Sequence, residues 1–427
     1  MKNFVLFTVL YLTTAFTYAQ TKLVKADAYL DVRSGKLIKP ANIIIEDGLI
    51  ISINPKSIPD KIEVIDLSGQ ILLPGLMDMH VHLDMDFVDG YQFQLLTESA
   101  SKRALRGTKN AEKTLMAGFT TVRNVGQVHP SLELINVALS EASNDEWIAA
   151  PRIIPCGHMI GISGGHADPA MMGGFAEKVM DLGPEYGIAD GKNEVLKATR
   201  YQIKHGAKAI KIMATAGVFS LEESVGAQQL TSEEMETIVQ EAKRHDITVA
   251  AHAHGTEGIM AAVRAGVTSI EHGTILTEEA IELMIEKGTY LVPTTGLMEI
   301  IPKGFDKMNP KLVEKAKYII PIAIESHENA VKAGVKIALG TDAPLIPHGM
   351  NAIELSAMVE RGMKPLEAIQ SSTIVAAEML NLTDRGEIKE GLFADIIAVE
   401  SNPLNDVKEL ENVKFVMKGG NVYKNEK

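Results

Sequence analysis

The sequence predicts an α/β fold: a (β/α)8 TIM barrel accompanied by a small β-sandwich built from both ends of the chain. The central part of the chain alternates apolar runs with amphipathic segments, as consecutive βα units do. Both ends instead carry short β-branched runs separated by turn signals. A length of 427 residues and a hydrophobic content of 46% suffice for a barrel with an accessory domain.

Residues 1–19 are typical of a secretory signal peptide. Lys2 supplies the basic start, residues 4–16 supply an apolar core, and small residues precede a cleavage position after Ala19. We therefore expect an exported protein, either periplasmic or secreted. No stable membrane anchor is expected after cleavage, because the apolar run is short for a transmembrane span.

Two terminal segments, residues 20–73 and 386–427, are expected to form the β-sandwich together, since neither is long enough for a comfortable domain alone. In the first segment, Asp47-Gly48 separates two β-branched runs, a pattern typical of a hairpin. The second segment carries three runs of similar character, at residues 394–399, 413–417 and 419–423.

Residues 74–385 form the expected barrel domain. Eight apolar runs predict its strands: residues 73–82, 119–125, 152–160, 207–214, 248–254, 267–272, 290–295 and 336–342. Glycines that can stop a helix stand before several of these runs: Gly118, Gly206, Gly266, Gly288 and Gly334. The helical segment 231–245 begins with Thr231 and has Glu234 three residues later, the spacing of a capping box.

Two histidines, His80 and His82, close the first run. In a strand, side chains at i and i+2 point to the same face, so both imidazoles would project together. Imidazole is a common metal ligand, and two on one face form a pincer. Alone this pattern is weak, because two hydrogen-bonded histidines in a half-buried strand would have the same spacing.

Further reactive side chains stand at or near the ends of other runs. Lys211 lies in the fourth run, His252 and His254 in the fifth, His272 in the sixth and Asp342 in the eighth. In a (β/α)8 barrel the reactive groups lie at the C-terminal ends of the strands. The strand prediction makes no use of these residues, so their positions support a shared site.

Lys211 requires an explanation, because an ammonium in an apolar strand is costly unless it is paired. Its pKa could be shifted, or its amine could react with CO2 to give a carbamate, an anion able to bridge two metal ions. The alternative is a lysine that points outward between helices. With the surrounding histidines, we favour the carbamate. Asp342 can take a proton from metal-bound water, whereas its alternative role is to cap the loop before Pro344.

Composition excludes several function classes. The net charge of −13 without a block of Lys or Arg argues against nucleic acid or an anionic membrane surface as a partner. Cys156 is the only cysteine, so no internal disulfide forms, and its apolar surroundings predict a buried, inert thiol.

Seven segments together resemble the amidohydrolase superfamily, and within it the imidazolonepropionase-like and Xaa-Pro dipeptidase (prolidase) group: PGLMDMHVH, GFTTVRNVG, GGHAD, IKIMATAGV, AHAHG, IEHGT and GTDAP. The resemblance covers nearly all of the expected mature chain and is more specific for the superfamily than for a substrate. It implies two divalent metal ions, expected to be zinc. The implied ligands are His80, His82 and Asp342 for the more buried ion, His252 and His272 for the outer ion, and N-carboxylated Lys211 as the bridge.

The function expected from this resemblance is hydrolysis of a peptide or amide C–N bond, with an Xaa-Pro-type dipeptide as the favoured substrate. A hydroxide shared by the metals would attack the carbonyl, and Asp342 would pass a proton to the leaving nitrogen. A mononuclear cyclic-amide hydrolase or deaminase is an alternative, against which Lys211 argues. A lactonase also stays open. A non-catalytic secreted binding protein is a remote alternative, because all six ligand positions are present.

Other residues are softer predictions. His166, in a glycine-flanked loop, and His254, on the same face as His252, are expected to bind substrate, although either could instead support the structure. Arg123 and His158 are weaker candidates. Four histidines are expected to be solvated: His129, His205, His245 and His327. Leu230 stands where dipeptidase relatives carry an aromatic residue that helps hold the substrate carboxylate, which weakens the specific prolidase assignment. A homo-oligomer stays open.

Overall fold

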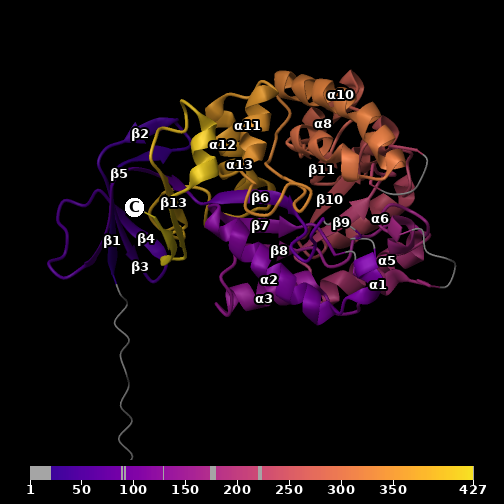
Figure 1. The fold of residues 1–427 in the computed structure, drawn as a ribbon, viewed down its shortest axis with the longest axis horizontal. Coiled ribbons are helices and arrows are strands. Elements are labelled where there is room, and N and C mark those ends of the chain that lie inside the picture. Colours follow the sequence, from indigo (N-terminus) through magenta and orange to yellow (C-terminus); the bar gives the residue numbers. More distant parts are fainter. Residues whose placement is uncertain are drawn as a thin grey trace, which may run out of the picture.

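The computed structural model describes six stretches of the chain: residues 21–87, 90, 93–127, 129–173, 179–219 and 224–426. The expected signal peptide lies outside these residues. In the described part, no helix combines the length and the apolar character that a bilayer span requires. The fold is α/β, with a mixed sheet and the C-terminus at one end of the molecule and helices packed around parallel strands at the other (Figure 1).

Both ends of the chain contribute to one eight-stranded mixed sheet. Its hydrogen-bonded order is β15-β14-β13-β5-β1-β3-β4, and β2 pairs with β1. The N-terminal strands are β1 (Lys22–Asp31), β2 (Lys36–Ile38), β3 (Ala41–Glu46), β4 (Leu49–Ile53) and β5 (Glu63–Pro74). The C-terminal strands are β13 (Ile396–Val399), β14 (Phe415–Lys418) and β15 (Asn421–Asn425). The ends join where β13 runs antiparallel to β5, with Ile396 opposite Pro74.

The mixed sheet encloses a hydrophobic core of its own, to which β1, β3, β4, β5, β13 and β14 all contribute. Hydrogen bonding makes it one continuous sheet instead of two separate ones. The turn between β3 and β4 lies close to the turn between β14 and β15, since a Cβ on Gly48 would lie 2.9 Å from the carbonyl oxygen of Gly419. The hairpin predicted at Asp47-Gly48 is confirmed: β3 and β4 pair across it, and both residues have the positive φ that a type I′ turn needs (49° and 76°).

Seven of the eight runs expected to form parallel strands contain one. Three form one parallel sheet: β6 (Leu76–Val81), β7 (Phe119–Asn124) and β8 (Arg152–Pro155). Four form a second: β9 (Ala209–Met213), β10 (Thr248–Ala253), β11 (Ser269–His272) and β12 (Tyr290–Val292). Nearly all their residues are buried, apart from those in β8. Burial on both faces explains why these strands read as continuous apolar runs.

The eighth run, residues 336–342, is not a strand, which corrects the prediction. It makes only an isolated parallel bridge, Ile337 with Leu291, and a second such bridge joins Ala343, the residue after the run, to Val81. The carboxylate of Asp78 explains the interruption, because it accepts the backbone N–H of Thr341, at 3.1 Å, in place of a ladder partner. On the other side, a bridge between residues 160 and 212 links the two parallel sheets.

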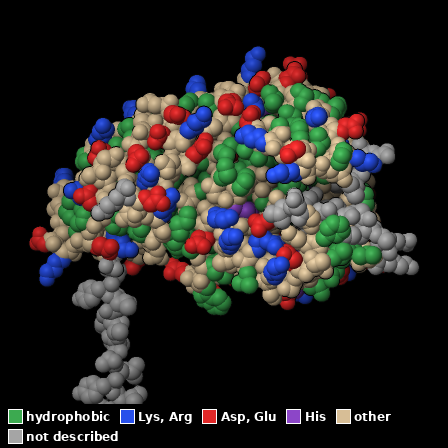
Figure 2. Space-filling view, in the orientation of Figure 1, with side chains coloured by type: hydrophobic (Ala, Val, Ile, Leu, Met, Phe, Trp, Pro, Cys, Tyr) green, Lys and Arg blue, Asp and Glu red, His purple; other side chains and the backbone are tan. Residues whose placement is uncertain are grey.

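Helices cover the parallel strands (Figure 1). The longer ones are α2 (Ala100–Met116), α3 (Ile135–Asn144), α5 (Lys192–Lys204), α6 (Ser232–Lys243), α7 (Thr256–Ala265), α8 (Glu278–Lys287), α10 (Pro310–Ala333) and α11 (Ile353–Glu360). Shorter ones are α1 (Gln94–Thr97), α4 (Pro169–Gly173), α9 (Leu297–Ile300), α12 (Pro365–Ser371) and α13 (Ile374–Met379). The capping box of Thr231 and Glu234 is confirmed at α6. Gly266, Gly288 and Gly334 end their helices in the left-handed conformation, as predicted. Lys and Arg side chains are interspersed with Asp and Glu on the face in Figure 2.

Candidate metal centre

The predicted ligands line one pocket at the C-terminal ends of the parallel strands. His80 stands at the end of β6, with His82 just beyond it, and His252 and His272 stand near the ends of β10 and β11. Lys211 in β9 and Asp342 in the eighth run reach the same pocket. Residues separated by up to 262 positions in the sequence (80 to 342) are therefore brought together by the strand arrangement.

His80, His82 and Asp342 form a first group of donors. One ligand atom from each lies within 4.8 Å of the others. The Nε2 atoms of His80 and His82 are 3.4 and 3.5 Å from Oδ1 of Asp342. Burial alone would raise the pKa of Asp342, but His80 and His82 beside it lower that pKa below its usual value. The aspartate is therefore held as the carboxylate that can ligate a cation.

His252, His254 and His272 form a second group, again with ligand atoms within 4.8 Å of one another. His252 and His272 were expected here as ligands, whereas His254 was expected to contact substrate. The geometry places His254 among the donors, with its ring stacked on that of His272 at 5.1 Å. Nε2 of His252 is buried without a hydrogen-bond partner, which is costly unless a bound group satisfies it.

In four of these histidines Nδ1 bonds to a protein group at 2.8 Å: His80 to Glu271, His82 to the Gly126 carbonyl, His254 to Thr274 and His272 to Thr294. A carbonyl or carboxylate oxygen accepts, so Nδ1 of His80 and of His82 carries the proton. Nε2 of a neutral ring then keeps its lone pair for a metal.

Burial keeps the imidazoles neutral. It lowers the pKa of His80 to about 4 and that of His254 to about 3, and it takes the pKa of His252 and His272 well below the usual value. Neutral imidazole is the form that binds metal ions. The neutral histidines of the cluster therefore do not repel a cation and can bind it.

Lys211 points into this cluster and is only 1% exposed. Its Nζ lies 3.5 Å from Nε2 of His80, which excludes the outward-facing alternative. Burial lowers the pKa of Lys211 to about 8. Near neutral pH, the neutral fraction of this amine is therefore larger than that of an exposed lysine, and the neutral amine is the species that can add to CO2.

The pocket walls beyond the donors are strongly apolar. They include Met85, Phe87, Met159, Met213, Val218, Phe219, Leu297, Met298, Ile301, Ile319, Ile320 and Leu345. His166 reaches the pocket as predicted, with its ring centroid 4.4 Å from that of His252. Leu230 instead lies in the hydrophobic core and is not among the pocket residues.

Two histidines expected to be solvated are buried. His129 is 6% exposed and its Nε2 bonds to the Glu98 carbonyl, while His327 is 1% exposed and its Nε2 donates to the carbonyl of His272. His327 thus lies on the inner face of α10, which the spacing of its neighbours did not reveal. His205 and His245 are exposed, as predicted.

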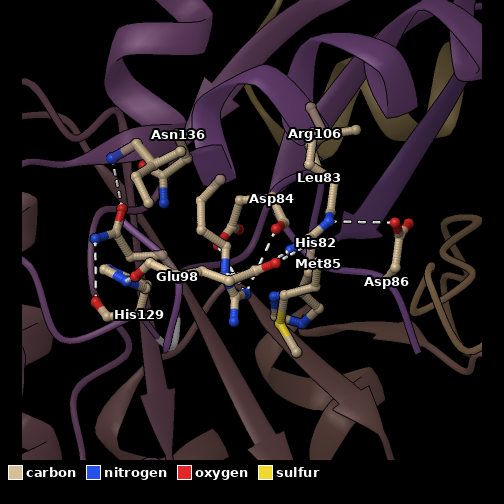
Figure 3. Close-up of polar contacts among 12 residues, drawn as sticks. His82, Leu83, Asp84, Met85, Asp86, Glu98, Arg106, His129 and Asn136 are labelled. Carbon is tan, nitrogen blue, oxygen red and sulfur yellow. Dashed lines mark hydrogen bonds and ion pairs between the residues drawn. The ribbon is translucent and has the colours of Figure 1, made fainter. Parts of the chain in front are cut away.

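The segment after β6, which includes His82, is anchored to helix α2. The Asn110 amide donates to the carbonyls of Leu83 and Met85, at 2.9 and 3.0 Å. Asp84 is fully buried, with Oδ2 3.8 Å from Nη1 of Arg103 on the same helix. Figure 3 shows Leu83, Asp84 and Met85 beside His82. The position of this histidine therefore depends on α2 as well as on β6.

Glu98 extends this anchor. Arg106 donates two hydrogen bonds of 2.6 Å to its carboxylate and lies 3.2 Å from Asp86 (Figure 3). The bond to Arg106 is the largest cause that lowers the pKa of Glu98 to about 2. A carboxylate with a depressed folded-state pKa contributes stability above its unfolded pKa, and this contribution is lost as the pH falls towards the folded value.

Acidification is therefore expected to erase the advantage of wild type over a Glu98→Gln variant. Thermal melts of both proteins should show their full difference at about pH 5 and above and should converge only as the pH falls to about 2, because the folded-state carboxylate becomes protonated there. A gap in Tm that stays constant across this range would show that the Glu98 ion pairs contribute nothing to stability.

Comparison with known proteins identifies the family of the chain. A sequence model described as Amidohydrolase family matches residues 71–423, a span that holds every donor from His80 to Asp342. Ochratoxinase of Aspergillus niger is 36% identical over 417 residues, covering 91% of this chain and 84% of that protein. Imidazolonepropionase of Kosmotoga olearia is 24% identical, covering 90% and 91%.

Two solved structures are similar over nearly the whole chain. The first, a Xaa-Pro dipeptidase with bound methionine in the active site, has a TM-score of 0.88 and 38% identity, covering 95% of this chain and 100% of that one. The second, the A. niger ochratoxinase, has a TM-score of 0.81 and 32% identity, covering 95% and 96%.

Proposed function

The chain belongs to the amidohydrolase family and is a hydrolase acting on C–N bonds, and from this premise we propose an exported enzyme with a binuclear metal centre that cleaves an amide beside an apolar group. Xaa-Pro dipeptides are the favoured substrates. One observation carries the proposal: two groups of three donors, each within 4.8 Å, share one pocket with a buried lysine. Export rests on the character of residues 1–19.

We propose that the two parallel sheets form one (β/α)8 barrel spanning residues 74–385. The bridges of the eighth run to β12 and to β6, and the bridge between residues 160 and 212, support this arrangement because they connect the two sheets at both joints. The mixed sheet, from residues 20–73 and 386–427, would then be the accessory domain that holds both ends of the barrel segment.

The donors suit divalent metal ions such as Zn²⁺, which prefers imidazole nitrogen and carboxylate oxygen. His80, His82 and Asp342 would hold one ion, and His252 and His272 the other, with His254 near enough to join them. Lys211, once carboxylated, would supply the shared anionic ligand. The partnerless Nε2 of His252 supports this reading, since a cation would satisfy it.

Bound metal ions would supply a water of lowered pKa and polarise the amide carbonyl. Proton transfer and the exclusion of bulk water would fall to the side chains of the protein. Asp342 stands in contact distance of both His80 and His82, so its carboxylate can accept the proton of the attacking water and deliver it to the leaving nitrogen. The apolar walls keep bulk water away and strengthen these electrostatic interactions.

The walls also bear on the substrate. Methionine side chains adapt to irregular apolar shapes, and four of them line the pocket: Met85, Met159, Met213 and Met298. Phe87 and Phe219 add an edge-to-face aromatic pair with centroids 5.8 Å apart. This pair favours a second candidate, ochratoxin, which the name of the Aspergillus relative suggests.

A substrate panel tests the proposal. Zinc-reconstituted protein should release amines from Xaa-Pro dipeptides, other apolar dipeptides or ochratoxin, and exhaustive chelation should lower the rate by roughly 1,000-fold, since metal catalysis supplies several kcal/mol. Restoring zinc to the same sample should restore the rate. Hydrolysis that persists in the chelated protein, or a panel without any cleaved amide, would overturn the proposed function.

A further inference from the structure

We propose that Glu271 and Arg123 are positioning residues: a buried charge pair that fixes the ring orientation and tautomer of His80, so that its Nε2 faces the metal centre. The inference rests on the proposed metal centre and concerns two charges that the reaction itself does not use. Glu271 and Arg123 are each 0% exposed, and they lie on two strands from different parallel sheets, β11 and β7.

Glu271 contacts His80 directly. Its Oε2 accepts from Nδ1 of His80 at 2.8 Å, and its Oε1 accepts from Arg123 Nη2 at 2.7 Å and from Ser269 Oγ at 2.5 Å. Both oxygens of the carboxylate therefore accept hydrogen bonds. An ionised carboxylate can only accept, so it selects the His80 tautomer with the proton on Nδ1. The lone pair of Nε2 is then directed at the pocket.

Arg123 holds this carboxylate in place and also holds the strand that bears His80. Its Nε donates to the carbonyl of Met79, the residue before His80, at 2.7 Å. Its Nη1 donates to Ser269 Oγ at 3.0 Å. One guanidinium therefore ties β6 to β11 through three hydrogen bonds, and its permanent charge keeps Glu271 ionised.

Stability alone does not account for such a pair. Replacing a buried ion pair by apolar residues of similar volume is often neutral or stabilising. Moreover, the other three histidines with an Nδ1 bond use neutral partners, a carbonyl or a threonine hydroxyl, whereas His80 uses a carboxylate. A carboxylate partner raises the basicity of the imidazole and its strength as a ligand.

The first variant is Glu271→Gln, which keeps the shape of the side chain but gives it a donor. The amide N–H2 can face Nδ1 of His80, which reverses the tautomer of the ring. Otherwise it faces the guanidinium of Arg123, where two donors oppose each other. The affinity of the His80 site for zinc, measured by chelator competition, should fall by about 10–100-fold. The visible spectrum of the Co²⁺-substituted protein should change at the same time, because it reports the ligand field of that site.

A second variant guards against misfolding, since Glu271→Gln leaves the Arg123 charge uncompensated. The double variant Arg123→Met with Glu271→Gln removes both charges and should melt near wild type. Its zinc affinity should still be lowered by about 10–100-fold if the pair positions His80. Wild-type zinc affinity with an unchanged cobalt spectrum in the double variant would overturn the inference.

Glu241→Gln is the matched control. Glu241, on the outer helix α6, is also buried and also pairs with arginines: Arg200 on α5 and Arg244 just after the end of α6. Its zinc affinity should equal that of wild type, and a loss equal to that of Glu271→Gln would overturn the inference. A wild-type protein without bound metal would overturn the proposed function together with this inference, whereas a defect limited to Glu271 and Arg123 variants supports both.

Discussion

Replacing Lys211 with alanine is expected to reduce the bound metal from two ions per chain to at most one and to lower amide hydrolysis by roughly 1,000-fold, because the ligand shared by both ions is lost. The side chain is 1% exposed, and its Nζ lies 3.5 Å from Nε2 of His80. Metal content by elemental analysis and kcat/KM on the best substrate of the panel measure both effects.

Lys208→Ala is the control for this change. Lys208 lies three residues earlier, just before β9, but its side chain is exposed. Both variants truncate a lysine side chain in the same segment, so only a role in the pocket separates them. A Lys211→Ala protein that keeps two ions per chain would refute the bridging role, and equal losses in both variants would point to a general effect of shortening a side chain in this segment.

Asp342→Asn is expected to lower kcat/KM by about 100- to 10,000-fold, the range for loss of a positioned acid–base group. Asparagine has nearly the same volume but cannot carry the proton from water to the leaving nitrogen. The loss should be greatest for alkyl amides, whose leaving nitrogen needs protonation, and smaller for anilides, whose leaving group departs more readily. Assays at saturating zinc separate this effect from weaker metal binding.

The leaving group therefore serves as the internal control for Asp342. If alkyl amides and anilides lost the same factor while metal content stayed at the wild-type level, Asp342 would not be the proton donor. If the loss were fully reversed by excess zinc, the carboxylate would act as a ligand alone.

Much of the fold could be predicted because each structural element leaves a local pattern. Parallel strands that are buried on both faces are largely apolar, and seven of the eight apolar runs do contain a strand. The Asp47-Gly48 turn carries the residues that tolerate positive φ. The eighth run does not form the predicted strand, because the side chain of Asp78 takes the backbone N–H of Thr341. These two residues are 263 positions apart in the sequence. Such a tertiary contact has no local signature.

The site shows the same division. His80, His82 and Lys211 were recognisable because polar side chains stood in apolar runs. Glu271 was not, because strand alternation assigns it to the face opposite His272 and its partner Arg123 lies 148 residues away. The signal that could have revealed the pair is the presence of opposite charges in two strands that are otherwise apolar.

His254 shows how spacing alone falls short. Its two-residue separation from His252 placed it on the same face, but could not distinguish a contact with substrate from a place among the donors. In the structure its ring centroid lies 4.6 Å from that of His252 and 5.1 Å from that of His272. That packing comes from the close approach of β10 and β11, which no local pattern encodes.

The account depends on two cations held by side chains from separate strands, and the most direct measurement is diffraction from crystals of the zinc-loaded wild-type protein at the zinc absorption edge. Two anomalous peaks per chain are predicted, one beside His80, His82 and Asp342 and the other beside His252 and His272, with Lys211 reaching both. A single peak, no peak, or a Lys211 side chain turned away from the peaks would contradict the account.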